Sequence, residues 1–299
     1  MSRRAGAAAG ARVADGRTVA RGEAYRRPSR LERVGAAVAA LVPEGALRRA
    51  LRAAYRAAIG VGSGGRGVKA TLPGGETVRL LPEYRFVTWN EAEYEAFYAA
   101  VHPGTVALDV GANVGAYALV MGRWVRPGGR VYAFEPAPDA FAGLERHVRL
   151  NGLEDTVTPV RAAVAGAAGR AGLRVDGLSG ANRLSSPGEG GLEVETMTID
   201  GFCAREGIVP AVIKIDVEGA ELEVLRGAEQ TIRAAGDGLA LFVEMHPTRW
   251  RELGITREDL EAELARQGLR AEPLRPAADP WALEGECLRL VRAAPEPTR

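Results

Sequence analysis

Short apolar runs alternate with longer helical patterns through the last two thirds of the chain. The strand-like runs occupy residues 105–110, 130–135, 157–164, 212–217, 239–245 and 287–293. Helical patterns follow several of them and end near Trp124, Asn151 and Ala235, and a further helical pattern covers 256–268. Alternation of this kind predicts an α/β fold, with a mostly parallel sheet and helices on both faces. In such sheets, ligands bind beyond the carboxyl ends of the strands.

The first part of the chain has a different pattern. Apolar residues recur at helical spacing from Leu31 to Ile59, interrupted by Pro43 and Gly45, which predicts two short amphipathic helices. We expect these helices to pack on the main domain or on a second copy of the chain, forming a homo-oligomer. A glycine-rich linker at 62–67 then precedes a β-hairpin over 69–81. This divides the chain into an Arg/Ala-rich, partly helical N-terminal extension (1–61) and a main domain (62–299).

Charge is distributed unevenly over a composition that is ordinary for a soluble protein. Apolar residues make up 46% and charged residues 26% of the 299 residues, and the net charge is +1. Residues 1–60 hold 13 arginines and 4 acids, a charge of +9, so the remaining residues carry −8. An arginine-rich extension could bind nucleic acid or anionic lipid, but a solvated extension is the interpretation we favour. Because the main domain is acidic, we expect no nucleic-acid partner.

The cysteines and the hydropathy of the chain indicate in which compartment the protein is expected. Cys203 and Cys287 are the two cysteines, and they lie too far apart in sequence for a metal-ligand or redox motif. The N-terminus lacks the apolar core of a secretory signal, and no apolar run approaches the length of a membrane span. We therefore expect a cytoplasmic protein in a reducing compartment.

The segment VIKIDVEGAELEVL (212–225) carries charges on an otherwise apolar strand. Lys214, Asp216 and Glu218 occupy alternate positions, so their side chains are predicted on one side of the strand. Because a buried unpaired charge is costly, these groups are either paired with one another or line a cavity. Lys214 is one of two lysines among 39 basic residues, which indicates a chemical reason for lysine here.

A glycine-rich turn follows the first strand of the main domain, in the segment VALDVGANVGAYALV (106–120). Asn113 replaces the second glycine of a dinucleotide fingerprint, and Asp109 disfavours phosphate by its charge. Glu135, 24 residues beyond Gly111, stands where an acid would hold a ribose. These features favour a cationic nucleoside without phosphates, S-adenosylmethionine (SAM), over NAD or ATP. The alternative is a plain strand-to-helix turn in which Asp109 caps nearby amides.

The same residues resemble a known family. The segments VALDVGANVGAYA, VYAFEPAP, RLNG, IKIDVEGAELEVLRGAE and LFVEMHP are similar, in order, to the signature blocks of FkbM-family class I SAM-dependent methyltransferases, and cover about residues 70–293. The resemblance implies a Rossmann-like, seven-stranded fold. It also implies SAM binding by Asp109, Gly111, Asn113, Gly115 and Glu135, with Ala163 near the adenine and Asp216 near the methionine part. The chain departs from the family in having only Ala165-Gly166-Ala167 where a polar adenine contact is expected.

The next strand contributes Glu244 and His246 in LFVEMHP. Imidazole titrates near neutral pH, so we expect His246 to act as general base, with Glu218 as the alternative and Lys214 orienting the cofactor or substrate. His246 could instead simply pack beneath Pro247. His102 and His147 lie in polar contexts and are predicted to face solvent.

The function expected from these features is SAM-dependent O-methylation of a hydroxyl on a small molecule, such as a sugar or a polyketide intermediate in natural-product biosynthesis. N- or carboxyl-methylation, or a catalytically silent SAM-binding partner, are the alternatives. Residues 175–191 form a polar stretch of the size used for lids. Asp216 and Glu244 could chelate Mg²⁺, but the positive charge of Lys214 opposes a cation there, so we predict metal-independent transfer.

Overall fold

The computed structural model describes residues 65–175, 182–185, 191–276, 279, 281 and 285–293. The predicted N-terminal extension and its two helices lie outside these residues.

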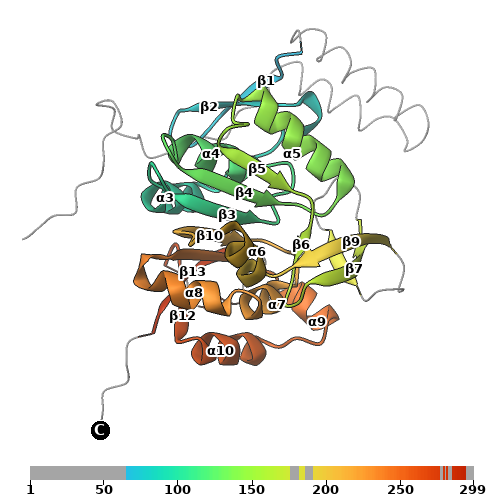
Figure 1. The fold of residues 1–299 in the computed structure, drawn as a ribbon, viewed down its shortest axis with the longest axis vertical. Helices are drawn as coiled ribbons and strands as arrows, with labels where there is room; N and C mark the ends of the chain where they lie inside the picture. Colours follow the sequence, from blue (N-terminus) through green and yellow to red (C-terminus); the bar gives the residue numbers. More distant parts are fainter. Residues whose placement is uncertain are drawn as a thin grey trace, which may run out of the picture.

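A seven-stranded sheet forms the centre of the described structure (Figure 1). Its strands are β3 (Val106–Val110), β4 (Arg130–Phe134), β5 (Val157–Val160), β10 (Val212–Ile215), β11 (Ala240–Met245), β12 (Leu269–Pro273) and β13 (Glu286–Arg292). Their spatial order is β12-β13-β11-β10-β3-β4-β5, and β13 runs antiparallel to both of its neighbours. The other pairs, from β11 across to β5, are parallel. The sheet is therefore mostly parallel, and the strand β12 is one that the apolar pattern did not predict.

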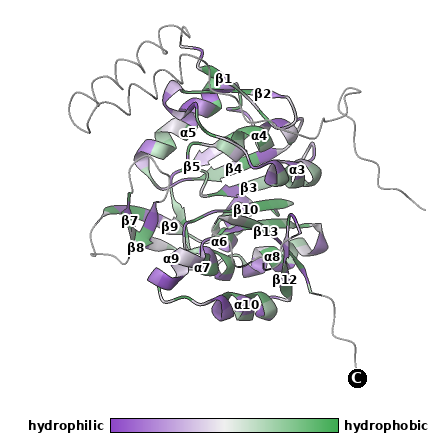
Figure 2. Cartoon of the chain, turned by 180° about the vertical axis from the view of Figure 1, so that it is seen from behind, coloured by the Kyte–Doolittle hydropathy of each residue, from purple (hydrophilic) through white to green (hydrophobic). Residues whose placement is uncertain are grey.

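Helices cover both faces of this sheet. One face packs against α3 (Glu91–Ala100), α4 (Ala116–Trp124) and α5 (Pro138–Leu150), and the other against α6 (Ile199–Glu206), α7 (Glu221–Arg226), α8 (Glu229–Ala235) and α10 (Arg257–Arg266). Strand alternation divides the core, since Ile213 and Ile215 belong to the second face. Hydrophobic residues accordingly concentrate in the central strands, whereas the helices have mixed surfaces (Figure 2).

The predicted hairpin is present as β1 (Val68–Thr71) and β2 (Thr77–Leu80), which pair antiparallel, and the short helix η1 (Pro82–Tyr84) follows it.

The prediction that His147 faces solvent is wrong. His147 is fully buried beneath this hairpin, where its Nε2 accepts from the amide of Leu81 at 2.8 Å and its Nδ1 lies 2.7 Å from the carbonyl of Val114. Burial lowers the pKa of His147, so the neutral ring joins the hairpin to the glycine loop.

A second, four-stranded sheet interrupts the alternation between β5 and β10. It comprises β6 (Ala163–Val164), β7 (Gly169–Arg174), β8 (Arg183–Ser185) and β9 (Leu192–Met197), in the order β6-β9-β7-β8. The single strand predicted over 157–164 is therefore wrong, because the chain leaves the main sheet after Val160 and Ala163 pairs with Thr196 instead. Part of the predicted lid, 183–185, is strand β8 of this sheet.

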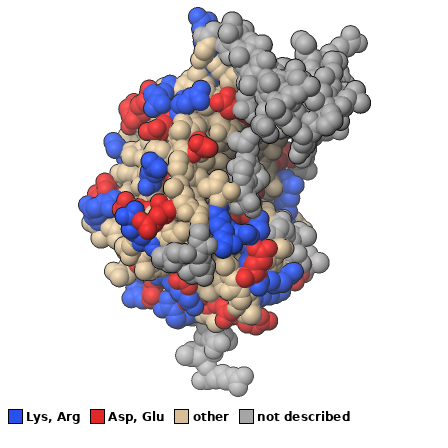
Figure 3. Space-filling model, turned by 90° about the vertical axis from the view of Figure 1, so that its right-hand side faces the viewer, with Lys and Arg blue, Asp and Glu red and all other residues tan. Residues whose placement is uncertain are grey.

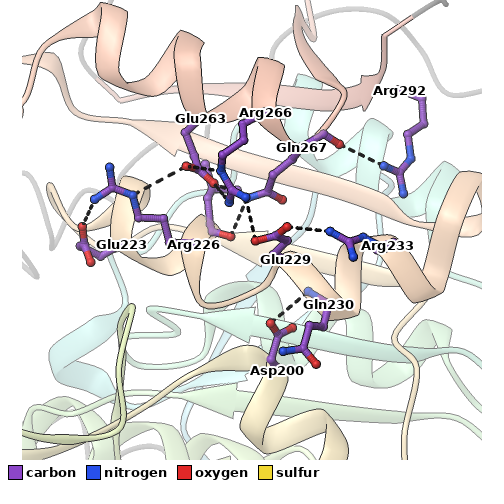
Figure 4. A network of polar contacts seen from close by, with 11 residues as sticks. Asp200, Glu223, Arg226, Glu229, Gln230, Arg233, Glu263, Arg266, Gln267 and Arg292 are labelled. Atoms are coloured by element: carbon purple, nitrogen blue, oxygen red, sulfur yellow. Dashed lines mark hydrogen bonds and ion pairs between the residues drawn. The ribbon is translucent and has the colours of Figure 1, made fainter.

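The helix predicted to run to Ala235 is divided into α7 and α8. A side chain at Gly227 would meet the carbonyl of Ala165 at 2.5 Å, so only glycine allows the chain to pass here. An ion-pair network then ties α7 and α8 to α10 (Figure 4). Arg226 pairs with Glu223 at 2.6 Å and approaches Glu263 at 3.7 Å, while Arg266 pairs with Glu229 at 2.9 Å and with Glu263 at 2.6 Å. The remaining elements are η2 (Gly236–Gly238) and α9 (Pro247–Glu252).

Candidate functional site

A cavity opens beyond the carboxyl ends of β3, β4, β10 and β11 and is bounded by the small sheet. Its lining includes Gly111, Asn113, Glu135, Ala163, Asp216, Glu218 and Glu244, together with Leu173, Asn182 and Leu184. The cavity thus joins the glycine loop, Glu135 and the charged strand ends, which the sequence predicted to lie together. Leu173, Asn182 and Leu184, which lie in or beside the small sheet, were not predicted. The polar stretch that contains Asn182 and Leu184 shows no strand pattern.

The glycine loop is shaped by its contact with the neighbouring strand. Gly111 has a φ of 81°, and a Cβ atom there would overlap the carbonyl oxygen of Asp216. Asn113 has a φ of 49°, and Glu218, with a φ of 53°, is the other described non-glycine residue in the left-handed region. Both line the cavity. Unfavourable backbone conformations of this kind concentrate at functional sites, which supports this cavity as the site.

Glu135 is fixed by the loops on both sides of it. Its Oε2 accepts from the amide of Asn113 at 2.9 Å, and its Oε1 accepts from the amide of Ala137 at 2.8 Å. Each oxygen keeps a free lone pair, so the carboxylate can accept two more hydrogen bonds from a ligand in the cavity. Burial raises the pKa of Glu135 to about 7, although the two amides act in the opposite direction.

Asp109 and Gly115, which are also expected to contact the cofactor, are not among the residues that line the cavity. Asp109 lies opposite Lys214 in the register of β3 and β10, so both side chains are on the same face of the sheet. This face packs against α4, where Tyr117 lies beside Lys214. Burial raises the pKa of Asp109 to about 6, while the nearby ammonium of Lys214 lowers it. Asp109 therefore acts as a buried counter-charge rather than as a cavity wall.

The surroundings of Lys214 account for the use of lysine at this position. Its side chain is 2% exposed, and its Nζ lies 2.9 Å from Oδ2 of Asp216. The same Nζ lies 5.2 Å from the ring centre of Tyr117 on α4. Burial alone would lower the pKa of Lys214, but Asp216 and Asp109 raise it above its usual range. Lys214 and Asp216 are thus paired with each other, and Asp216 and Glu218 also line the cavity, so both alternatives apply.

His246 is held by two residues that sequence reasoning missed. Its Nδ1 lies 2.7 Å from Oε1 of Glu221, which also accepts from the amide of Gly219 at 3.0 Å. The other oxygen of Glu221 accepts from the indole of Trp250 at 2.7 Å. Glu221 is fully buried, although a glutamate in the first turn of a helix ordinarily faces solvent. The sequence feature that could have drawn attention to Glu221 is its spacing from Glu218, three residues earlier.

The Nε2 atom of His246 faces three carboxylates. It lies 3.7 Å from Oε1 of Glu244, 3.9 Å from Oδ1 of Asp216 and 3.9 Å from Oε2 of Glu218. Arg249 adds one positive charge, with its Nε 3.7 Å from Oε2 of Glu218. Burial raises the pKa of Glu244 to about 8, and the charge of Asp216 adds to this effect.

These carboxylates determine the charge state of the imidazole. Burial alone would lower the pKa of His246, but its hydrogen bond to Glu221 and the charges of Glu221, Asp216 and Glu218 raise it to about 9. The surrounding carboxylates therefore favour the protonated form of the ring, which is the form that cannot accept a proton. His246 is also absent from the cavity lining, whereas Glu218 is part of it.

The surface around the site carries charges of both signs. On the side where the small sheet lies, basic and acidic side chains of the described residues are interspersed rather than gathered into one basic patch (Figure 3). None of the described helices combines the length and apolar composition needed to cross a bilayer.

Comparisons with known proteins agree with this geometry. The methyltransferase FkbM domain matches residues 109–270, more than half of the chain. A hexuronic acid methyltransferase, AglP of Haloferax volcanii, is 31% identical over 172 residues, which cover 56% of this chain and 64% of that protein. The 31-O-demethyl-FK506 methyltransferase FkbM of Streptomyces tacrolimicus is 34% identical over 161 residues, covering 43% of this chain and 61% of that protein. The match thus spans less than two thirds of either relative.

Among solved structures, an rRNA methylase from Streptococcus thermophilus has a TM-score of 0.44 and 9% identity, covering 68% of this chain and 96% of its own. That likeness is too distant to inform function. The FkbM match, in contrast, includes the glycine loop, Glu135 and the charged strand ends around the cavity. The chain therefore belongs to the FkbM family of methyltransferases.

Proposed function

We propose that the protein transfers a methyl group from SAM to a hydroxyl oxygen of a small molecule, such as a sugar or a polyketide-type compound. The observation that carries this proposal is one cavity with two ends of different chemistry. We assign Glu135 and the glycine loop to the nucleoside end and Asp216, Glu218 and Glu244 to the acceptor end, and the two ends meet where Gly111 contacts the carbonyl of Asp216.

The first end fits the nucleoside part of SAM. Glu135 has two free lone pairs beside two backbone amides, an arrangement that suits the paired hydroxyls of a ribose. Ala163 and Leu173 provide apolar surface for an adenine, which accounts for a site without a polar adenine contact at 165–167. When bound, SAM supplies a methyl group on a positively charged sulfur, with the thioether as leaving group. Asp216 and Glu244 are close enough to attract that positive charge.

The second end fits an uncharged acceptor. Three carboxylates in the lining would repel an anionic carboxylate acceptor, so a hydroxyl is favoured over a carboxyl group. Glu218 is the residue we assign as proton acceptor, because it lines the cavity and burial raises its pKa toward neutrality. Glu218 would take the proton of the acceptor hydroxyl as the hydroxyl oxygen accepts the methyl group that SAM would supply, and the neutral thioether would be the leaving group. Lys214 holds Asp216 in place at 2.9 Å.

The names of the relatives support this substrate class. One relative acts on a hexuronic acid and the other at an oxygen of a demethylated FK506 compound. The second name specifies an oxygen acceptor, whereas a hexuronic acid offers a carboxyl group as well as hydroxyls and does not distinguish between them. Because the match covers less than two thirds of each relative, the acceptor of this chain is a proposal of class only.

Calorimetric titration with SAM tests the cofactor part of the proposal. Glu135→Gln should weaken SAM binding by about 1.5 to 3 kcal/mol, the contribution of hydrogen bonds to a charged group. The matched control is Glu195→Gln on β9, since Glu195 is exposed and outside the lining, and its SAM affinity should equal that of the wild type. Equal affinity in wild type and Glu135→Gln would refute the assignment of Glu135 to the ribose.

A further inference from the structure

We propose that Asp216, Glu244 and His246 form a binding site for a divalent metal ion at the acceptor end of the cavity. Each of the three residues offers one ligand atom, and these atoms lie within 4.8 Å of one another. Asp216 follows β10, and Glu244 and His246 end the adjacent strand β11, so the main sheet itself brings them together.

The orientation of His246 is the second observation that points to an ion. Its side chain is 4% exposed, and its Nδ1 is occupied by Glu221. The opposite nitrogen, Nε2, points at the carboxylates, and no described residue lies within hydrogen-bonding distance of it. A histidine that is fixed through one nitrogen by a carboxylate, with the other nitrogen left free, is the usual arrangement of a metal ligand.

The spacings fit an ion better than direct pairing. Nε2 lies 3.7 Å from Oε1 of Glu244 and 3.9 Å from Oδ1 of Asp216. Both distances are too long for hydrogen bonds. Two ligands about 2.1 Å from one ion are separated by about 3.0 to 4.2 Å for ligand angles between about 90 and 180°. Both carboxylate oxygens therefore lie at ligand spacing from Nε2, and all three atoms lie within 4.8 Å of one another.

The expectation of metal-independent transfer rested on the positive charge of Lys214, but its ammonium does not occupy the position that the ion needs. Its Nζ contacts Oδ2 of Asp216, while Oδ1 of the same carboxylate faces His246. Formal charges also leave room for a divalent cation. Four carboxylates surround His246 (Asp216, Glu218, Glu221 and Glu244), whereas two side-chain cations, Lys214 and Arg249, contact this group. A metal ion would take the place of the proton on His246, because an imidazole binds a metal in its neutral form.

The donor set indicates which ion to test. Two carboxylates suit Mg²⁺ or Mn²⁺, and the imidazole shifts the preference toward a first-row transition metal such as Mn²⁺. At the acceptor end, the ion would lower the pKa of a coordinated hydroxyl, whose proton passes to Glu218. This role in catalysis rests on the proposed function, but binding of the ion does not.

The test is a titration of the full-length protein with MnCl₂ after treatment with EDTA and removal of the chelator. Electron paramagnetic resonance measures free Mn²⁺ and so gives binding without any assay of activity. We expect saturable binding of one Mn²⁺ per chain in the wild type. Asp216→Asn, Glu244→Gln and His246→Ala should each weaken it at least about 10-fold, and Glu221→Gln, which acts through the position of His246, should weaken it about 10- to 100-fold.

Glu258→Gln on α10 is the matched control, because Glu258 is exposed and far from the cavity in sequence and fold, and it should bind Mn²⁺ as the wild type does. Circular dichroism of each variant identifies any loss of folding, and three separate ligand variants guard against the failure of one. Absence of saturable Mn²⁺ binding in the wild type, or equal binding in the folded ligand variants, overturns the proposal. A parallel SAM titration keeps the two proposals apart, since Mn²⁺ binding without SAM binding would refute the proposed function alone.

Discussion

The Nδ1 atom of His246 lies 2.7 Å from Oε1 of Glu221, so the first turn of α7 fixes a side chain at the end of β11. The indole of Trp250 on α9 occupies the other oxygen of Glu221 at 2.7 Å. Helices α7 and α9 lie beside each other at this edge of the sheet (Figure 1). The direction of the imidazole is therefore set by three elements together, which is the rigidity that a positioned ligand or catalytic group requires.

Loss of Glu221 should destabilise the fold. Glu221→Ala leaves the buried donors of Gly219, His246 and Trp250 without their acceptor, and we expect a loss of about 3 to 5 kcal/mol in the free energy of unfolding. Urea denaturation measures this loss. The control is Glu223→Ala on the same helix, where the half-exposed pair with Arg226 contributes at most about 1 kcal/mol. Similar effects of the two substitutions would show that the Glu221 contacts do not stabilise the fold.

The two lysines of the chain provide another matched pair. Lys214→Ala removes the positive charge that offsets Asp216 and Asp109, and should cost about 3 to 5 kcal/mol of stability. Lys69 on β1 is exposed, so Lys69→Ala should change stability by no more than about 0.5 kcal/mol. The comparison uses urea denaturation at one pH. A neutral effect of Lys214→Ala would mean that Asp216 and Asp109 take up protons at no cost once the lysine is lost.

SAM affinity should depend on pH through Glu135. The pKa of this carboxyl is raised to about 7, and its bonds to the ribose hydroxyls require the ionised form. Affinity should therefore fall as pH drops below 7, by up to about 10-fold per pH unit from this group alone. Calorimetry between pH 5.5 and 8.5 measures the dependence.

The stability of the ligand-free protein should change with pH in the opposite sense. Because the native pKa of Glu135 lies above its unfolded value, the native state holds the proton more tightly, and this contribution is lost as pH rises through 7. Glu135→Gln cannot titrate, so both pH dependences should become weaker in this variant. Identical pH profiles in wild type and variant would assign the titration to another group.

Local sequence signals predicted those parts of the fold that depend on local pattern. The strand alternation around Lys214 and the turn residues around Gly111 were sufficient to place β3, β10 and the cavity edge. The pairing of Lys214 with Asp216, one of the two alternatives that the sequence left open, is present at 2.9 Å, because two charges on one buried strand end have few other partners.

Features that depend on contacts between distant segments were not predictable in this way. Ala163 pairs with Thr196, more than thirty residues later, so the small sheet leaves no continuous strand pattern. His147 was placed in solvent because its polar neighbours in sequence lie on the outer side of α5, while the hairpin that buries it comes much earlier in the chain. Glu221 was missed for the same reason, since its buried partners belong to other elements.

A crystal structure of the protein with S-adenosylhomocysteine, the product of methyl transfer from SAM, tests the central claim most directly. The account predicts the nucleoside in the cavity between the glycine loop and the small sheet, with both ribose hydroxyls within hydrogen-bonding distance of the Glu135 carboxylate. The sulfur should face Asp216, Glu218 and Glu244. A ligand bound outside this cavity, or a ribose held by groups other than Glu135, would contradict the account.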